Sequence, residues 1–143
     1  MKWGESPVKK SKFRFWLILS LLWMGVIILH ACMPASTSNA ESRGVLAVVQ
    51  MFLPWMTHAV LRSLAHFFSY LVLGLFVTAT CKHAKNFSLL KPLALCQFAA
   101  LCDETIQRFT PGRAGELRDL WVDLGGALLG SLVLWLIYKL RKR

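Results

Sequence analysis

Four apolar runs, each about as long as a membrane-spanning helix, constrain this chain more than any other feature. A spanning helix needs about 20 mostly apolar residues, and lipid offers no water to hydrogen-bond an open backbone. The runs cover residues 13–32, 59–81, 87–107 and 120–138. The chain has 143 residues, enough for one domain. We therefore predict an all-α integral membrane protein with four transmembrane helices.

The basic residues predict the orientation of these helices. They gather before the first run, between the second and third, and after the fourth: Lys2, Lys9, Lys10, Lys12, Arg14; Lys82, Lys85, Lys91; Lys139, Arg141, Lys142, Arg143. Because positive loops stay in the cytoplasm, we expect both termini there. The predicted organisation is a basic tail at 1–12, one four-helix membrane domain at 13–138, and a basic tail at 139–143. The net charge of +10 thus indicates topology, and we predict membrane lipids rather than nucleic acid as partners.

Two segments near the first run have alternative interpretations. Residues 1–40 resemble a signal peptide with a cleavage site at 38–40, but the apolar core is long for one, which favours a retained span. Residues 45–56 are apolar but short and contain Gln50 and Pro54. We expect this segment to form a short outer-surface or re-entrant helix between the first two spans.

The cysteines form no C-x-x-C pair and lie mostly in or beside apolar runs: Cys32, Cys81, Cys96 and Cys102. Their distribution is typical of buried small hydrophobes. A disulfide between Cys32 and Cys102 is the alternative, because both residues fall near the outer ends of their predicted spans.

Polar side chains recur at helical spacing near the outer ends of three runs. Arg62, His66 and Tyr70 are four residues apart on the second run, so they share one face, with Gly74 a turn further on. The other two sets are Asp103, Glu104 and Gln107 at the end of the third run, and Asp119, Asp123, Gly126 and Gly130 on one stripe of the fourth. A Pro111-Gly112 turn with Arg113 lies between them. We expect all of these side chains to meet at the outer end of the bundle.

Simpler structural roles are open for several of these residues. Asp119 has the side chain of an N-cap, and Gly126 and Gly130 suit close helix approach in a membrane. An unpaired charge at this depth would cost several kcal/mol, however. We therefore expect Asp119 and Asp123 to face the bundle interior and to meet Arg62, Arg113 or His66.

Residues 60–130 resemble the VanZ-like family of membrane proteins. The blocks that carry this resemblance are Arg62-x-x-x-His66-Phe67-x-x-Tyr70-x-x-x-Gly74, Asp103-Glu104-x-x-Gln107-x-Phe109-x-Pro111-Gly112-Arg113-x-Gly115, and Asp119-x-x-x-Asp123-x-x-Gly126-x-x-x-Gly130. Ser63, Ser69 and Asp123 stand where the family often has Lys, Glu and Asn. This exchange of an acid between two spans indicates a rearranged charge network. The resemblance implies a small multi-pass protein of the bacterial cytoplasmic membrane, and the family's namesake is associated with teicoplanin resistance.

The leading functional hypothesis is a polar outer-face site that binds or modifies a lipid-linked or anionic envelope component. The candidate catalytic residues are His66, Asp103, Glu104, Asp119 and Asp123, and the candidate substrate-binding residues are Arg62, Tyr70, Gln107 and Arg113. Arginine forks suit anionic groups, and a histidine beside an acid suits general-base chemistry. We predict no cofactor and no metal, because metal ligands usually have tighter sequence spacing.

Other functions are also compatible with the pattern. The charged residues could only hold the bundle together in an accessory subunit of an envelope assembly or secretion system. A proton-coupled transporter is a third hypothesis, although four short spans are few for alternating access. His66 with Asp103 and Asp123 is the set of ligands that a metal would use.

Overall fold

The computed structural model describes residues 7–84 and 87–141. Within them the chain is all-helical, as predicted, with five helices and no strand. The helices are α1 (Pro7–Ala31), α2 (Ala35–Gln50), α3 (His58–His83), α4 (Leu90–Phe109) and α5 (Leu117–Leu140). Parts of the predicted basic tails, residues 1–6 and 142–143, and Lys85 of the middle loop lie outside the described residues.

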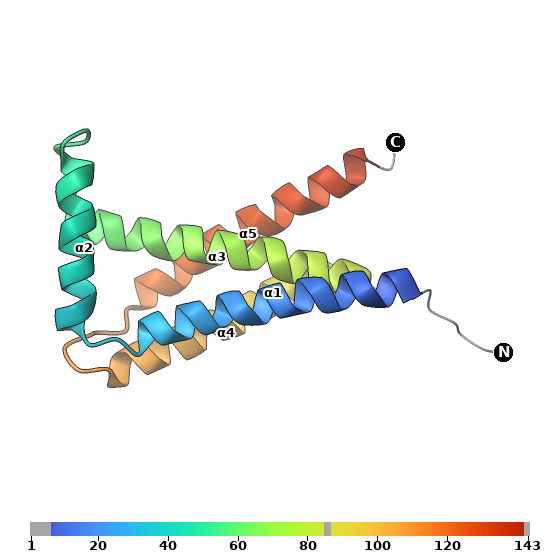
Figure 1. The fold of residues 1–143 in the computed structure, drawn as a ribbon, viewed down its shortest axis with the longest axis horizontal. Helices are drawn as coiled ribbons and strands as arrows, with labels where there is room; N and C mark the ends of the chain where they lie inside the picture. Colours follow the sequence, from blue (N-terminus) through green and yellow to red (C-terminus); the bar gives the residue numbers. More distant parts are fainter. Residues whose placement is uncertain (1–6, 85–86, 142–143) are drawn as a thin grey trace.

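Four helices run lengthwise as a bundle, and α2 lies across one end of it (Figure 1). The ends of α1 and α5 that lead to the chain termini are at the opposite end (Figure 1). We call these the α2 end and the terminal end. Helix α3 contacts all four other helices, so it forms the centre of the bundle.

Three helices are long and apolar enough to cross a membrane: residues 10–31 of α1, all of α3 and all of α5. The protein is therefore a multi-pass membrane protein. Helix α4 has 20 residues, which corresponds to about 30 Å, but it is not among these three. Its polar residues Asp103, Glu104 and Gln107 are buried. They lower the hydropathy of α4 without facing the surroundings of the bundle.

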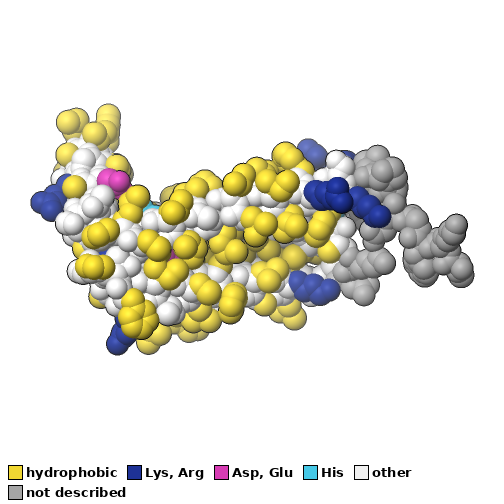
Figure 2. Space-filling view, turned by 60° about the horizontal axis from the view of Figure 1, so that its bottom comes forward, with side chains coloured by type: hydrophobic (Ala, Val, Ile, Leu, Met, Phe, Trp, Pro, Cys, Tyr) yellow, Lys and Arg dark blue, Asp and Glu magenta, His cyan; other side chains and the backbone are white. Residues whose placement is uncertain are grey.

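The surface of the bundle is largely apolar (Figure 2). Leu22 and Leu29 of α1, Phe98 of α4 and Trp121 of α5 are all exposed. Lys and Arg side chains gather beyond this apolar region at the terminal end (Figure 2). Such a surface suits lipid rather than water, since soluble monomers rarely expose large apolar patches.

The connection between α1 and α3 differs in detail from the prediction. A helix is present there, but α2 begins at Ala35, directly after Pro34, ten residues earlier than expected, and ends at Gln50. The chain then turns, and Pro54 lies in this turn segment. A proline prevents the helix from continuing because it lacks the N–H that the next hydrogen bond needs. Residues 38–40, which resemble a cleavage site, lie inside α2.

The cysteines make no disulfide: Cys32, Cys81, Cys96 and Cys102 are all free thiols. The alternative pairing of Cys32 with Cys102 is therefore not formed. Only Cys96 is buried, and Cys32 is exposed.

Glycines bring α3 and α5 into backbone contact. A Cβ atom at Gly126 would overlap the carbonyl oxygen of Phe67, and one at Gly130 would overlap that of Leu71. Gly74 of α3 meets the backbone of Ala127 in the same way. The predicted close approach is confirmed, and we call Gly74, Gly126 and Gly130 the glycine seam. It sets the spacing of the two helices that carry most of the polar residues.

Candidate functional site

The predicted polar residues meet at the α2 end of the bundle. Helix α3 contributes Arg62, His66 and Tyr70, α4 contributes Asp103, Glu104 and Gln107, and α5 contributes Asp119 and Asp123. All but Arg62 are buried. The helical periods of α3 and α5 explain this, because each set lies on the face that packs against the neighbouring helices.

Arg62 and Asp119 form a short ion pair between α3 and α5. Arg62 Nη2 donates to Asp119 Oδ2 at 2.9 Å, and the Asp119 side chain is only 1% exposed. The same nitrogen also approaches Gln107 Oε1 and the Ala114 carbonyl at 3.4 Å. Asp119 is not an N-cap, since α5 begins at Leu117. The pair ties α3 to α5 and to the loop before it, as the cost of an unpaired charge predicts.

His66 and Asp123 form a second contact between α3 and α5. His66 Nδ1 lies 3.1 Å from Asp123 Oδ1, and the side chains are 9% and 0% exposed. The expectation that Asp123 meets a basic residue inside the bundle is confirmed. Such a bond orients an imidazole ring and sets which nitrogen carries the proton.

The two acids of α4 are held by different groups. Asp103 accepts hydrogen bonds from the Tyr70 hydroxyl at 3.3 Å and from Gln107 Nε2 at 2.9 Å. Glu104 Oε2 accepts from the backbone N–H of Glu116 at 2.7 Å. This bond requires Gly115, because a Cβ atom there would lie 2.6 Å from the Glu104 carbonyl oxygen. The glycine therefore lets the α4–α5 loop pass close to α4.

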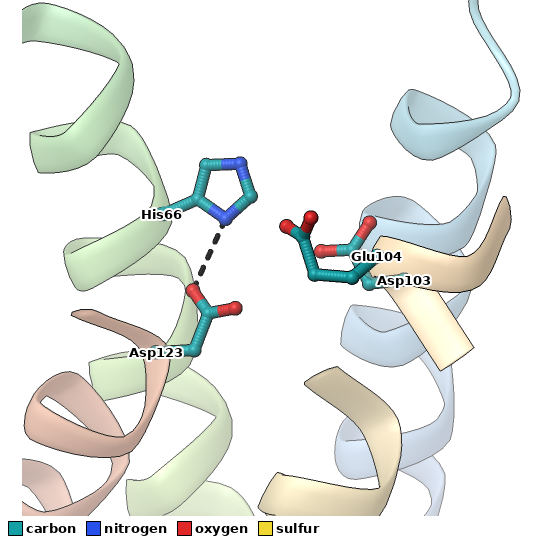
Figure 3. A group of neighbouring side chains, drawn as sticks. All are labelled: His66, Asp103, Glu104 and Asp123. Carbon is teal, nitrogen blue, oxygen red and sulfur yellow. Dashed lines mark hydrogen bonds and ion pairs between the residues drawn. The ribbon is translucent and has the colours of Figure 1, made fainter. Parts of the chain in front are cut away.

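His66, Asp103, Glu104 and Asp123 form one group, which we call the acidic cluster. One nitrogen or oxygen atom of each lies within 4.8 Å of the others. The carboxylates of Asp103 and Glu104 point from α4 toward His66 and Asp123 across a shared space (Figure 3). Glu104 Oε1 and Asp123 Oδ2 are buried and have no hydrogen-bond partner. The arrangement can exchange protons or hold a cation.

A cavity of about 210 Å³ adjoins this cluster. His66, Tyr70, Asp103 and Gln107 form its polar wall. The rest of the lining comes from α1 and from the facing part of α3: Trp23, Val26, Ile27, His30, Ala65 and Ser69. A cavity with one polar and one apolar wall suits an amphiphilic ligand.

The loop between α4 and α5 covers this end of the bundle. Gly112 has a positive φ of 73°, the left-handed conformation that glycine adopts readily. The Pro111 carbonyl accepts a hydrogen bond from Ala35 N at 3.1 Å. Arg113 Nη1 donates to the carbonyl of His30, a residue lining the cavity, at 2.7 Å. Burial lowers the pKa of Arg113, but arginine starts so far above neutrality that the charge remains. The predicted cap is thus attached to α1 and α2.

Sequence reasoning missed the contribution of α1 to the cavity. Trp23, Val26, Ile27 and His30 are spaced by three, one and three residues, which places them on one helical face. Trp23 Nε1 also donates to the Ser69 carbonyl at 2.9 Å. The sequence contains this spacing, but in an apolar run the same spacing is expected for a helix face that contacts lipid and for one that lines a cavity.

The family model described as VanZ/LLP1 matches residues 15–138 of the chain. The match covers every residue of the acidic cluster and most of α1, and it is longer than the 60–130 region on which the resemblance was based. No curated protein and no solved structure matches the chain.

Proposed function

The chain belongs to the VanZ/LLP1 family, and we propose that it binds or modifies an anionic, lipid-linked component of the cell envelope. The site of this activity is the cavity beside the acidic cluster. The observation that carries the proposal is the composition of this cavity: titratable side chains of α3 and α4 face apolar side chains of α1. Two of the three helices that line the cavity, α1 and α3, are long and apolar enough to cross a membrane.

An apolar groove supports a ligand with a lipid chain. It measures about 470 Å³ and lies between the same three helices as the cavity, with Leu17, Met24, Val77 and Phe98 in its lining. Its walls are almost entirely apolar, so it offers an acyl or prenyl chain a surface like that of the membrane. The polar head of the same molecule would occupy the cavity.

One basic side chain beside the cavity supports an anionic head group. Arg113 does not line the cavity but is bonded to the carbonyl of His30, which does, and its fork of donors matches phosphate or carboxylate. His66, oriented by Asp123 at 3.1 Å, is the candidate general base. Arg62 does not line the cavity; it donates a hydrogen bond to Asp119.

The proposal includes a topology in which α4 also spans the membrane and both termini are cytoplasmic. The basic residues at the terminal end support this orientation. Exposed Phe52 and Trp55 follow α2 at the other end, where aromatic side chains would lie at the lipid–water interface. The cavity then faces the outer leaflet, where envelope precursors are used.

The test compares cells that lack the gene with cells that express the wild type or His66→Ala. We expect the deletion to change the lipid-linked fraction of an envelope-lipid profile, and His66→Ala to behave like the deletion at normal membrane levels. His83→Ala is the matched control, because His83 lies at the end of α3 remote from the cavity. An unchanged profile for His66→Ala would contradict the proposal. Teicoplanin susceptibility of the same strains tests the link to resistance.

A non-enzymatic accessory role is the second candidate, and the Arg62–Asp119 pair favours it. Asp119 is fully buried and its partner is fixed, as expected of a residue that holds the bundle together. This role predicts that Asp119→Ala and His66→Ala reduce the amount of folded protein alike. Immunoblots of membrane fractions separate it from a site-based function.

A further inference from the structure

We propose that the acidic cluster binds one divalent cation, with His66, Asp103, Glu104 and Asp123 as its ligands. The candidate ligand atoms all lie within 4.8 Å of one another. Two ligands on opposite sides of an ion, each at about 2.1–2.4 Å, are about 4.2–4.8 Å apart. The separations of the four atoms are therefore within the span of the ligand shell of a single ion.

Two unpartnered oxygens point to a missing ligand. Glu104 Oε1 and Asp123 Oδ2 have no hydrogen-bond donor, although their residues are only 7% and 0% exposed. A buried oxygen without a partner loses the hydrogen bonds that it made to water, and charged groups lose the most. Both carboxylates border the space between α4 and the His66–Asp123 pair (Figure 3). A cation in that space would satisfy both oxygens.

The charges of the cluster favour the same conclusion. Three of its four residues are acids, and His66 is its one basic member. Of the two arginines near the cluster, Arg62 is already paired with Asp119 at 2.9 Å and Arg113 is bonded to the His30 carbonyl at 2.7 Å. Tyr70, Gln107 and the backbone of Glu116 donate hydrogen bonds to the cluster, but they carry no positive charge. A divalent ion would offset most of the buried negative charge, which is costly when unpaired.

The ligand types narrow the choice of ion. Carboxylates suit Mg²⁺, Ca²⁺ and Mn²⁺, whereas imidazole suits transition metals, so three carboxylates with one imidazole favour Mn²⁺. His66 and Asp103 also line the cavity, so one side of the ion would face it. An anionic oxygen of a ligand could bind there. This last consequence rests on the proposed function, but cation binding itself does not.

The test uses the full chain purified in detergent, stripped with EDTA and dialysed against Mn²⁺. We expect the wild type to retain one Mn²⁺ per chain by elemental analysis, and the ion to raise its Tm. Glu104→Gln keeps the shape of the side chain but removes its charge, so it should weaken binding at least about tenfold. Glu116→Gln is the matched control: its side chain is 47% exposed and lies outside the cluster.

Two results would overturn the cation site. One is a stripped wild type that retains no ion when it is dialysed in turn against Mn²⁺, Mg²⁺, Ca²⁺ and Zn²⁺, which would mean that the acids are neutralised by protons. The other is a Glu104→Gln variant that binds as tightly as the wild type. Asp103→Asn replaces Glu104→Gln if the latter does not fold. No envelope lipid enters this assay, so a failure here leaves the proposed lipid ligand untouched, and a normal lipid profile leaves the ion site standing.

Discussion

The glycine seam and the acidic cluster both lie against α3 and α5, but they are built in opposite ways. At the seam, Gly126 and Gly130 leave no room for a methyl group between the helices. In the cluster, Glu104 and Asp123 each keep a buried oxygen without a partner, and a cavity of about 210 Å³ lies beside them. The seam is fully packed by the chain itself, whereas the cluster keeps polar atoms and space that the chain does not fill.

This difference indicates that the glycine seam stabilises the bundle and that the acidic cluster is the part suited to binding. Helices in lipid associate through close packing and satisfied hydrogen bonds, and Thr78 Oγ1 donates to Ser131 Oγ at 2.9 Å near the seam. Unsatisfied buried polar groups are uncommon in native structures and call for an explanation. A region that lacks partners within the chain and adjoins a cavity is therefore a candidate for binding something else.

The largest expected loss of stability is for Asp119, which holds α5 against α3 as the glycine seam does. Asp119→Ala removes the carboxylate closest to Arg62, which keeps only Glu116 at 4.0 Å, and should lower the free energy of unfolding by about 3 kcal/mol. Reversible unfolding of the purified protein in mixed detergent micelles measures this loss. The double variant Arg62→Met/Asp119→Ala should recover part of it, because it removes both charges. A double variant as unstable as the sum of its single changes would show that the pair contributes no stability.

Gly126→Ala tests the seam directly. The added Cβ would overlap the Phe67 carbonyl oxygen, so α3 and α5 must separate, at a cost of about 1–3 kcal/mol by the same unfolding measurement. Gly125→Ala is the matched control, since its Cβ would lie 3.7 Å from Phe67 Cε2, an ordinary contact. Equal stability of the two variants would mean that the seam does not set the helix spacing.

Thr78→Val should have a smaller effect. It removes the hydrogen bond to Ser131 and leaves that buried hydroxyl without its donor, which should cost about 1 kcal/mol. Thr105→Val provides the comparison, because Thr105 is exposed and bonds only within its own helix. If both variants lose the same stability, the loss reflects helix propensity rather than the contact between α3 and α5.

Glu104→Gln should have the smallest effect on stability in metal-free protein. It removes a charge that lacks a full set of partners, while an amide oxygen can still accept from Glu116 N. We therefore expect stability to stay constant or to rise by up to about 1 kcal/mol. Unfolding in EDTA measures this, and added Mn²⁺ should reverse the order of variant and wild type. If Glu104→Gln lowers the free energy of unfolding as much as Gly126→Ala does, the acidic cluster stabilises the bundle as the glycine seam does, and the comparison is wrong.

Much of the site was predictable because helical periodicity is local. Spacings of three and four residues placed Arg62, His66 and Tyr70 on one face of α3, and Asp119 and Asp123 on one face of α5. The cost of buried charge then predicted that these acids meet basic residues. The small size of Gly126 and Gly130 also indicated close approach of helices in a membrane. Such inferences need only the geometry of one helix and the lipid around it.

Other features depend on contacts between helices that are far apart in the sequence, which the spacing of residues within one helix does not predict. Asp119 pairs with Arg62 and Asp123 with His66, each across 57 residues of chain. The apolar cavity wall from α1, including Trp23, likewise depends on which face α1 turns toward α3.

The amino-acid sequence alone was enough to predict the apolar helices α1, α3 and α5, the polar faces and the pairing of the buried charges, since all three follow from helical period and the cost of charge in lipid. The folded structure was needed to show that Asp103 and Glu104 join His66 and Asp123 in one cluster with two unpartnered oxygens. The reason is that the cluster forms only when α3, α4 and α5 lie at the right distances from one another. The backbone contacts of the glycine seam set the distance between α3 and α5.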